Sequence, residues 1–403
     1  TISYSVTGVQ TCALPICSLY EKLAIVNPGV SELELYEFRY ALEAMTPGNG
    51  WDSVVLESQN EIEQKVNRRD FFESIQLKPR DGNRLVLDPT IVKFTWMIFA
   101  GLVSGFYPVE WVCRHFYFDI RGFLFFHRTT YFTDSVQSYL GGAPLRCFEP
   151  RQRRFDREQA IGYKAFKEAN RDVDEYFMDC VLSLARIHGK PILVGIAGPT
   201  AAGKTEIVAR LQEKIIEAGE TVTTLEMDHF LTDREYREQQ GIDSLGREAL
   251  HFNLFLTCLE QLRMGRKVST PRYDFVSATS SHDLEGHLKP GSAPLEVDPA
   301  DIIFLEGNFP FLLAEVAGHV AIKVVYLTDD AVRMKRKWKR DMDYRKKYDR
   351  EYFCNRYFRE QFLMAESVYI PQMMTCDLVV DTTGGCVWAS RQARQLLELG
   401  GLG

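Results

Sequence analysis

The spacing of hydrophobic positions changes along this 403-residue chain. Up to about residue 188, apolar residues recur every three to four positions, as in "SELELYEFRYALEAM" and "REQAIGYKAFKEANRDVDEYFMDCVLSLARIHG". This is the spacing of amphipathic helices. After His188 the chain shows short apolar runs that alternate with helical segments, namely "PILVGIA", "TVTTLEMD", "ADIIFLEG", "AIKVVYLT" and "CDLVVDTT". Such runs are typical of parallel strands that are covered on both faces.

The pattern therefore predicts a mainly helical domain over residues 18–188 and an α/β domain over residues 189–403, with a parallel sheet and helices on both faces. A chain of 403 residues also exceeds what one hydrophobic core usually fills. Residues 1–17 are set apart, because "VTGVQTCALPI" resembles a reading-frame translation of a sequencing-library adaptor, and we expect a non-native tail there. The basic stretch "EPRQRRFDRE" is interpreted as a surface loop or linker.

Composition narrows the class of protein. The hydrophobic and charged fractions, 45% and 26%, are ordinary for a globular protein, and the net charge of −7 argues against nucleic acid as a partner. The longest uncharged stretch, "FTWMIFAGLVSGFYPV", is shorter than the about 20 residues that cross a bilayer, so it predicts a buried helix and no membrane partner. Nine cysteines without a C-x-x-C pair suggest neither a disulfide framework nor a zinc site, and hence a reducing, cytoplasmic setting.

The stretch "GPTAAGKT" follows the first predicted strand directly and precedes an amphipathic helix. Gly198 and Gly203 permit a tight backbone whose N–H groups point at phosphate oxygens, and the helix N-terminus adds its dipole. Lys204 can reach the β- and γ-phosphates, and the Thr205 hydroxyl suits Mg²⁺. The predicted nucleotide-binding residues are Gly198, Pro199, Thr200, Ala201, Ala202, Gly203, Lys204 and Thr205.

Two carboxylates end the next predicted strands. Asp228 follows the second strand in "LEMDHF", and Glu306 ends the third in "IIFLEGNFPF". The carboxyl ends of parallel strands face the ligand crevice, so Asp228 can accept a proton from an attacking hydroxyl and Glu306 can hold Mg²⁺ or its water. The alternatives are a helix N-cap or turn aspartate at 228 and a solvated loop carboxylate at 306.

From about residue 191 to residue 383 the chain resembles the phosphoribulokinase and uridine kinase family of P-loop kinases, the uridine kinase branch most of all. The resemblance rests on the phosphate loop, "DHF", "LEQLRMGRKVSTPRYDF", "ADIIFLEG" and the basic helix "RMKRKWKRD". It covers roughly the C-terminal half and none of the N-terminal domain.

The resemblance implies roles for individual residues. It makes Asp228 the general base and places Glu306 with Thr205 at the Mg²⁺ site. The acceptor-binding residues that it implies are Asp228, Phe230, Asp243, Tyr273 and Phe275, and Asp274 would help to fix the turn.

The resemblance also implies a set of catalytic basic residues. Arg336 and Arg340 match lid positions that approach the transferring phosphate, where they would join Lys204, and Lys337 replaces a basic lid residue. The alternative for this helix is a solvated, charged face.

The acceptor remains open between a nucleoside such as uridine and a sugar-like alcohol. Uridine kinases follow the Tyr-Asp-Phe turn with a histidine that reads the base, and Ala278 stands at that place here. His282 is either its substitute or a surface histidine in a Ser-rich loop, and Asn308 resembles family members that act on other small alcohols.

These observations predict an ATP- and Mg²⁺-dependent kinase that phosphorylates a hydroxyl of a small molecule. Two alternatives stay open: a P-loop NTPase switch that couples hydrolysis to the N-terminal domain, and a nucleotide-binding scaffold. A homo-oligomer is compatible with the sequence.

Overall fold

The computed structural model describes residues 10–26, 30, 54–66, 89–119, 124–149, 170–242, 246–341 and 364–402. The chain divides into two compact units. Unit 1 comprises residues 1–129, 154–160 and 349–363, and unit 2 comprises residues 130–153, 161–348 and 364–403. The segments "SELELYEFRYALEAM" and 150–158, and the predicted site residue Asp243, lie outside the described residues.

The described part of unit 1 is helical with one hairpin. Its elements are α1 (Gln10–Val26), α3 (Gln59–Val66), α5 (Pro89–Ser104), α6 (Val109–His115) and the antiparallel strands β1 (Phe116–Asp119) and β2 (Leu124–His127). Helix α5 carries the long apolar stretch and packs against α1, which confirms the predicted buried helix. Among the described residues, no helix is both long and apolar enough to cross a membrane.

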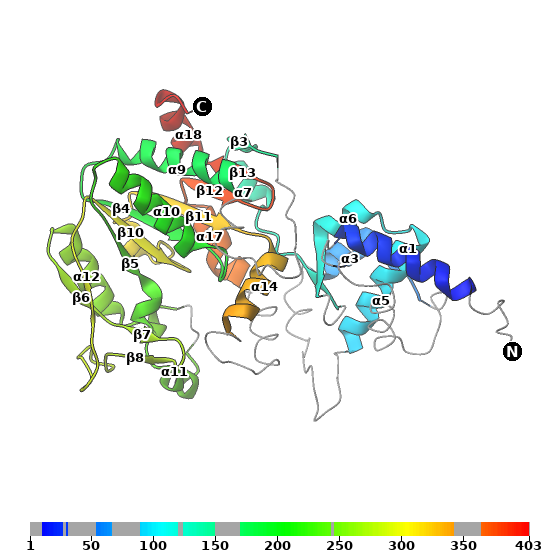
Figure 1. The fold of residues 1–403 in the computed structure, drawn as a ribbon, viewed down its shortest axis with the longest axis horizontal. Helices are drawn as coiled ribbons and strands as arrows, with labels where there is room; N and C mark the ends of the chain where they lie inside the picture. Colours follow the sequence, from blue (N-terminus) through cyan, green and yellow to red (C-terminus); the bar gives the residue numbers. More distant parts are fainter. Residues whose placement is uncertain are drawn as a thin grey trace, which may run out of the picture. The chain divides into compact units, whose positions relative to one another are not determined.

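Unit 2 is built on a seven-stranded sheet (Figure 1). In sheet order its strands are β3 (Arg146–Cys147), β13 (Cys386–Ala389), β12 (Leu378–Asp381), β11 (Ile322–Leu327), β4 (Ile192–Ala197), β10 (Ile302–Gly307) and β5 (Val222–Glu226). The last five are mutually parallel and coincide with the five predicted strands, whereas β13 and β3 pair antiparallel at one edge. The predicted α/β class is confirmed.

Alternation along the strands gives each face of the sheet its own core. In β4, Ile192, Val194 and Ile196 join one cluster, while Leu193 and Ala197 join the other. The first face is covered by α9 (Arg171–Ala185), α10 (Lys204–Glu217) and α18 (Arg391–Leu399). The second face is covered by α7 (Asp134–Tyr139), α12 (Phe252–Arg263), η7 (Ala365–Tyr369) and α17 (Ile370–Met373).

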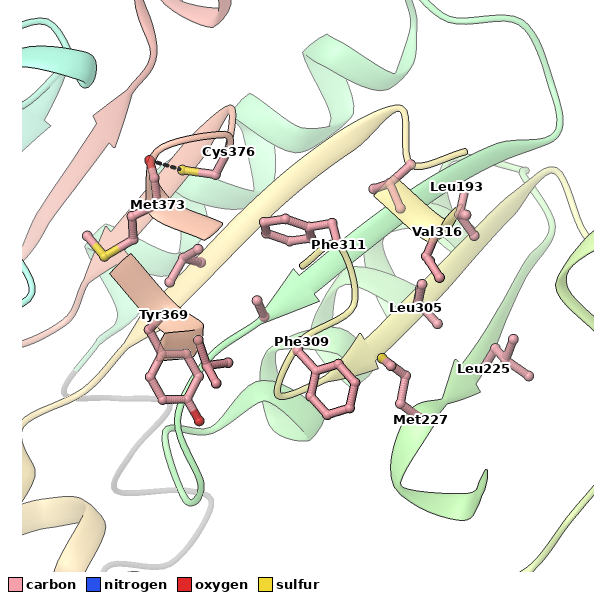
Figure 2. Packing of buried hydrophobic residues seen from close by; sticks show 14 of the residues in the cluster. Leu193, Leu225, Met227, Leu305, Phe309, Phe311, Val316, Tyr369, Met373 and Cys376 are labelled. Atoms are coloured by element: carbon pink, nitrogen blue, oxygen red, sulfur yellow. Dashed lines mark hydrogen bonds between the residues drawn. The ribbon is translucent and has the colours of Figure 1, made fainter. Parts of the chain in front are cut away.

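Figure 2 shows part of the second cluster, where Leu193, Leu225 and Leu305 project from three neighbouring strands. Phe309 and Tyr369 lie at the end of the cluster to which the parallel strands point, close to the loops that follow those strands. The core on this face therefore continues up to the edge where a ligand crevice is expected.

Helix α9 precedes the predicted domain boundary at residue 188 and yet packs in unit 2. Its Val173, Phe177 and Val181 share a cluster with Ile192 and Val194 of β4. The boundary stays a prediction about where the kinase domain begins. The chain ahead of that boundary nevertheless supplies one of the helices that cover the first face of the sheet in unit 2.

One sequence-based expectation about the cysteines is wrong. Cys147 and Cys386 form a disulfide, with their Cα atoms 4.1 Å apart. The two residues are 239 positions apart in the chain, and they meet because β3 pairs with β13 in a register that sets one opposite the other. Spacing along the sequence carries no sign of such a pair.

The remaining described elements of unit 2 connect these strands and helices. They are η3 (Met227–Phe230), α11 (Arg234–Gln240), η4 (Arg247–Ala249), α13 (Ala314–Ala317), α14 (Asp330–Lys339) and the short strands β6 (Val268–Thr270), β7 (Tyr273–Asp274), β8 (Thr279–Ser280) and β9 (Leu295–Val297). Strand β6 pairs with β9 and β7 pairs with β8, both antiparallel.

Candidate active site

The phosphate loop joins β4 to α10. Ala201 and Gly203 have left-handed φ angles of 61° and 104°. Gly198 lies so close to β11 that an added Cβ would be 2.3 Å from the backbone oxygen of Tyr326. A glycine at 198 is therefore required by the packing of the loop on the neighbouring strand.

Side chains hold the carbonyl groups of this loop. Lys204 Nζ donates to the oxygens of Gly198 at 2.9 Å and of Pro199 at 3.4 Å. Thr328 Oγ1 donates to the oxygen of Ala202 at 2.7 Å. These carbonyl groups are hydrogen-bonded within the protein. The side chains of Lys204 and Thr328, together with the packing of Gly198 against β11, therefore fix the conformation of the loop.

An acidic group adjoins the first turn of α10. Thr205 Oγ1 donates to both carboxylate oxygens of Glu306, each at 3.2 Å. Burial raises the pKa of Glu306 to about 7; the Lys204 charge opposes this, and the Glu226 and Asp228 charges add to it. Glu226 is the register partner of Glu306 between β5 and β10, and the sequence analysis did not single it out.

This donor set fits Mg²⁺. Within the described residues no three His, Cys, Asp or Glu side chains form a metal-binding group. Mg²⁺, however, is usually held by one or two carboxylates together with substrate phosphates and water. A hydroxyl and a buried carboxylate in contact, Thr205 and Glu306, suit that mode of binding.

Asp228 lies in η3, the turn that directly follows β5. It is partly buried, and its charge raises the pKa of Lys204, Glu306 and Tyr369. The carboxylate thus shares one electrostatic environment with the phosphate loop.

Basic side chains of α14, and of Arg340 directly after it, contact the phosphate loop. Arg340 donates to Thr200 Oγ1 at 2.9 Å, and Arg333, which is fully buried, donates to the Thr200 oxygen and the Tyr131 hydroxyl at 3.4 Å each. Lys337, also buried, pairs with Asp341 at 2.9 Å. Arg333 and Lys337 therefore do not lie on a solvated helix face.

Arg333 was not among the site residues predicted from the sequence. Arg333 and Arg336 lie three positions apart on α14, and Arg340 follows the last residue of that helix, so the three arginines recur at helical intervals of three and four. This spacing could have identified Arg333. Burial of the Lys204 ammonium lowers its pKa, and the charges of Arg340 and Arg333 act in the same direction, which places both guanidinium groups near it.

Arg336 lies at the same loop but contacts its carbonyl groups. It donates to the oxygens of Ala201 at 3.3 Å and Ala202 at 3.4 Å. Its predicted approach to the transferring phosphate stays a prediction.

The "PRYDF" segment forms the β7–β8 hairpin beside η3. The backbone N–H of Tyr273 donates to His229 Nδ1 at 3.2 Å, and the ring of Phe275 lies against both His229 and Tyr273. Asp274 accepts from the backbone N–H groups of Val276 and Ser277 and so holds the turn, as predicted. The hairpin is therefore anchored to the turn that carries Asp228.

Phe230 has a different environment from the one that the resemblance implied. Its side chain is fully buried, and its ring packs edge-on against Phe255 of α12 with the centroids 5.1 Å apart. This position favours a packing role beneath the site.

The two residues on which the prediction of the acceptor depended, Ala278 and His282, are both buried. Ala278 has a left-handed φ of 60°, and its oxygen accepts from the Tyr273 hydroxyl at 3.0 Å. His282 is 7% exposed, and its Nδ1 lies 2.9 Å from Ser281 Oγ, so the interpretation as a surface histidine is wrong. The bridge between His282 and Leu288 brings this segment inward.

A second buried histidine, His251, lies 3.1 Å from Ser280 Oγ through its Nε2, with the His282 ring 6.4 Å away. Burial lowers the pKa of His251; the charges of His282 and Lys289 act with it, and those of Asp233 and Asp283 act against it. Because the unfolded chain then takes up a proton at higher pH than the folded protein, this histidine makes folding less favourable as pH falls below about 6.5.

We expect His251→Gln to reduce the pH dependence of stability. Between pH 7 and pH 5.5 the wild-type melting temperature should fall relative to that of the variant, because glutamine keeps a hydrogen bond to Ser280 and takes up no proton. Thermal unfolding of both proteins across this range measures the difference. If the difference in melting temperature between the two proteins stayed constant with pH, His251 would have the same pKa in the folded and unfolded chains.

Comparison with known proteins shows which family this chain resembles. A sequence model of the phosphoribulokinase/uridine kinase family matches residues 193–386. A uridine kinase of Lactobacillus helveticus is 30% identical over 156 residues, which are 38% of this chain and 69% of that protein. A uridine kinase of Leuconostoc citreum is 27% identical over 159 residues, which are 39% of this chain and 71% of that protein.

A solved structure, described as a possible uridine kinase from Bacillus stearothermophilus, is similar at 22% identity and a TM-score of 0.32, covering 44% of this chain and 92% of that one. The family match spans the phosphate loop, the turn with Asp228, the hairpin with Tyr273 and the strand that ends at Glu306. On the sequence match and the 30% identity together, this chain belongs to the phosphoribulokinase/uridine kinase family of P-loop kinases.

Proposed function

We propose that the protein is an ATP- and Mg²⁺-dependent kinase that transfers the γ-phosphoryl group to a hydroxyl of a small metabolite, with residues 189–403 as its catalytic domain. One observation carries the proposal. The adjacent parallel strands β4, β10 and β5 bring Lys204, the Thr205–Glu306 pair and Asp228 together at one edge of the sheet.

In this proposal the loop and helix α10 hold the triphosphate. The backbone N–H groups at the start of α10 and the Lys204 ammonium bind phosphate oxygens. Thr205 and Glu306 hold Mg²⁺, which when bound neutralises charge on the phosphates. Arg333 of α14 and Arg340, which directly follows that helix, add positive charge beside the same loop.

Asp228 orients the acceptor hydroxyl and accepts its proton as the new O–P bond forms. It lies on a turn at the carboxyl end of β5, where its charge acts on Lys204 of the phosphate loop. The hairpin residues Tyr273 and Phe275 form the wall on the acceptor side, which His229 ties to the turn.

Which acceptor the site binds depends on the polar side chains that can form hydrogen bonds with it. The relatives named as uridine kinases favour a nucleoside. Ala278, however, supplies no hydrogen-bonding side chain, and His282 already engages Ser281 through Nδ1. A site that hydrogen-bonds a base rejects analogues without the bonding group by about 10⁴-fold. Because Ala278 offers no such bond and Nδ1 of His282 is already engaged, a sugar-like alcohol without a base is an equal candidate.

The test is ADP release from the purified protein with Mg²⁺ and ATP across a panel of nucleosides, pentose phosphates, pantothenate and glycerate. One acceptor that raises turnover well above the rate without acceptor, with a phosphorylated product detected by mass spectrometry, would support the kinase and name its substrate. Hydrolysis that no acceptor changes would contradict it and favour an NTPase switch. Nucleotide binding without turnover would favour a scaffold.

A further inference from the structure

A buried carboxylate lies behind the phosphate loop, on the helix that precedes the family-matched residues. Asp174 of α9 is completely buried. Its Oδ1 accepts a hydrogen bond from the Tyr326 hydroxyl of β11 at 2.7 Å, and its Oδ2 accepts one from Arg210 of α10. Three elements of unit 2 therefore converge on this one side chain.

Burying this charge is costly unless other charges balance it. Burial raises the pKa of Asp174 to about 6, whereas Tyr326, Arg210 and the charge of Arg336 lower it. Arg210 is itself buried, so the carboxylate and its arginine depend on each other. Tyr326 of β11, the third partner, carries the backbone oxygen that lies against Gly198 of the phosphate loop.

Arg336, whose charge lowers the pKa of Asp174, contacts the phosphate loop through the carbonyls of Ala201 and Ala202. A trans peptide plane directs its N–H opposite to its C=O, so the direction of the Ala202 carbonyl sets that of the Gly203 N–H. Ala201 is also in the left-handed region, which is unfavourable for a residue with a Cβ and persists only with outside support. Arg336 and Thr328 supply that support.

We propose that Asp174 is a positioning residue of the nucleotide site: it holds Tyr326 of β11 and Arg210 of α10 behind the phosphate loop, and its charge acts on Arg336 there, so that the N–H groups at the start of α10 stay directed at the phosphates. The proposal rests on nucleotide binding by this loop, as in the proposed function. It gives the chain ahead of the family-matched region a part in binding ATP.

The test compares Asp174→Asn with Asp179→Asn. Asp179 lies on the same helix and pairs with Lys214 of the same partner helix α10, but both side chains are partly exposed. Asparagine at 174 keeps the shape and removes the charge. In Asp174→Asn we expect the dissociation constant of Mg·ADP and the KM for ATP to rise by about 10-fold or more, as for other residues that orient ligand-binding groups. In Asp179→Asn we expect both constants to stay unchanged.

Two further readouts separate positioning from a loss of folding. The KM for the acceptor should not change in Asp174→Asn, and calorimetry of Mg·ADP binding needs no acceptor, so it stands even if the kinase assay finds none. Arg336→Met alone should weaken Mg·ADP binding to a similar degree, and the double variant should be little weaker than either single one. Unchanged ADP affinity in Asp174→Asn, or effects of the two substitutions that simply add, would overturn the proposal.

Discussion

Replacing Asp228 with Asn is expected to slow phosphoryl transfer by about 10²- to 10⁴-fold, the contribution typical of a general base. The amide keeps the shape of the side chain but does not take the proton of the acceptor hydroxyl. ATP binding should remain nearly intact, because Lys204, Thr205 and the loop backbone are unchanged. The measurements are kcat with the acceptor found in the panel and the dissociation constant of Mg·ATP.

The matched control is Asp298→Asn, which removes an exposed carboxylate that pairs with Lys267. It should leave both quantities as in the wild type. Turnover of Asp228→Asn equal to that of the control would remove the aspartate from the reaction. Loss of ATP affinity together with turnover would instead assign Asp228 to the nucleotide and Mg²⁺ side of the site.

Gly198→Ala is expected to weaken ATP binding by about 10- to 100-fold. A Cβ at this position would lie 2.3 Å from the backbone oxygen of Tyr326, and a strand in the middle of the sheet cannot move to make room. Forcing an atom into a well-packed site costs about 1–3 kcal/mol, and each 1.4 kcal/mol that shifts the loop is a factor of ten in affinity. Isothermal calorimetry with Mg·ADP measures the loss.

Gly189→Ala is the control for this substitution. Gly189 lies just before β4, its backbone is outside the left-handed region, and an added Cβ would meet no atom within 4 Å. Normal ADP affinity in Gly189→Ala beside weak binding in Gly198→Ala would locate the effect in the loop. Equal affinities would show that the loop adjusts to the extra methyl group without cost.

Local patterns were sufficient where a feature is encoded within a few neighbouring residues. The five parallel strands appear as short, largely apolar segments, and the inner strands β4 and β10 are buried at every position because both of their faces are covered. The phosphate loop is one continuous stretch whose backbone requires its glycines. The turn at Asp274 is held by its own neighbours, Val276 and Ser277, so its motif contains all the necessary information.

Features that depend on distant contacts were missed or misjudged. His282 looked like a surface residue because its loop is rich in serine, but it is buried, and its ring lies 6.4 Å from that of His251, which precedes α12. Arg333 looked like one basic residue of many until its contact with Tyr131, 202 positions earlier, showed it to be buried.

The sequence by itself determined that this chain has a phosphate loop on a parallel α/β sheet, and that Asp228 and Glu306 lie close to the carboxyl ends of two of its strands. Only the tertiary structure decided that Cys147 pairs with Cys386, that Arg333 is buried against the phosphate loop, and that Asp174 of α9 bonds Tyr326 and Arg210. The reason is physical: strand and loop preferences act between neighbours, whereas these contacts exist only after the sheet has brought remote segments together.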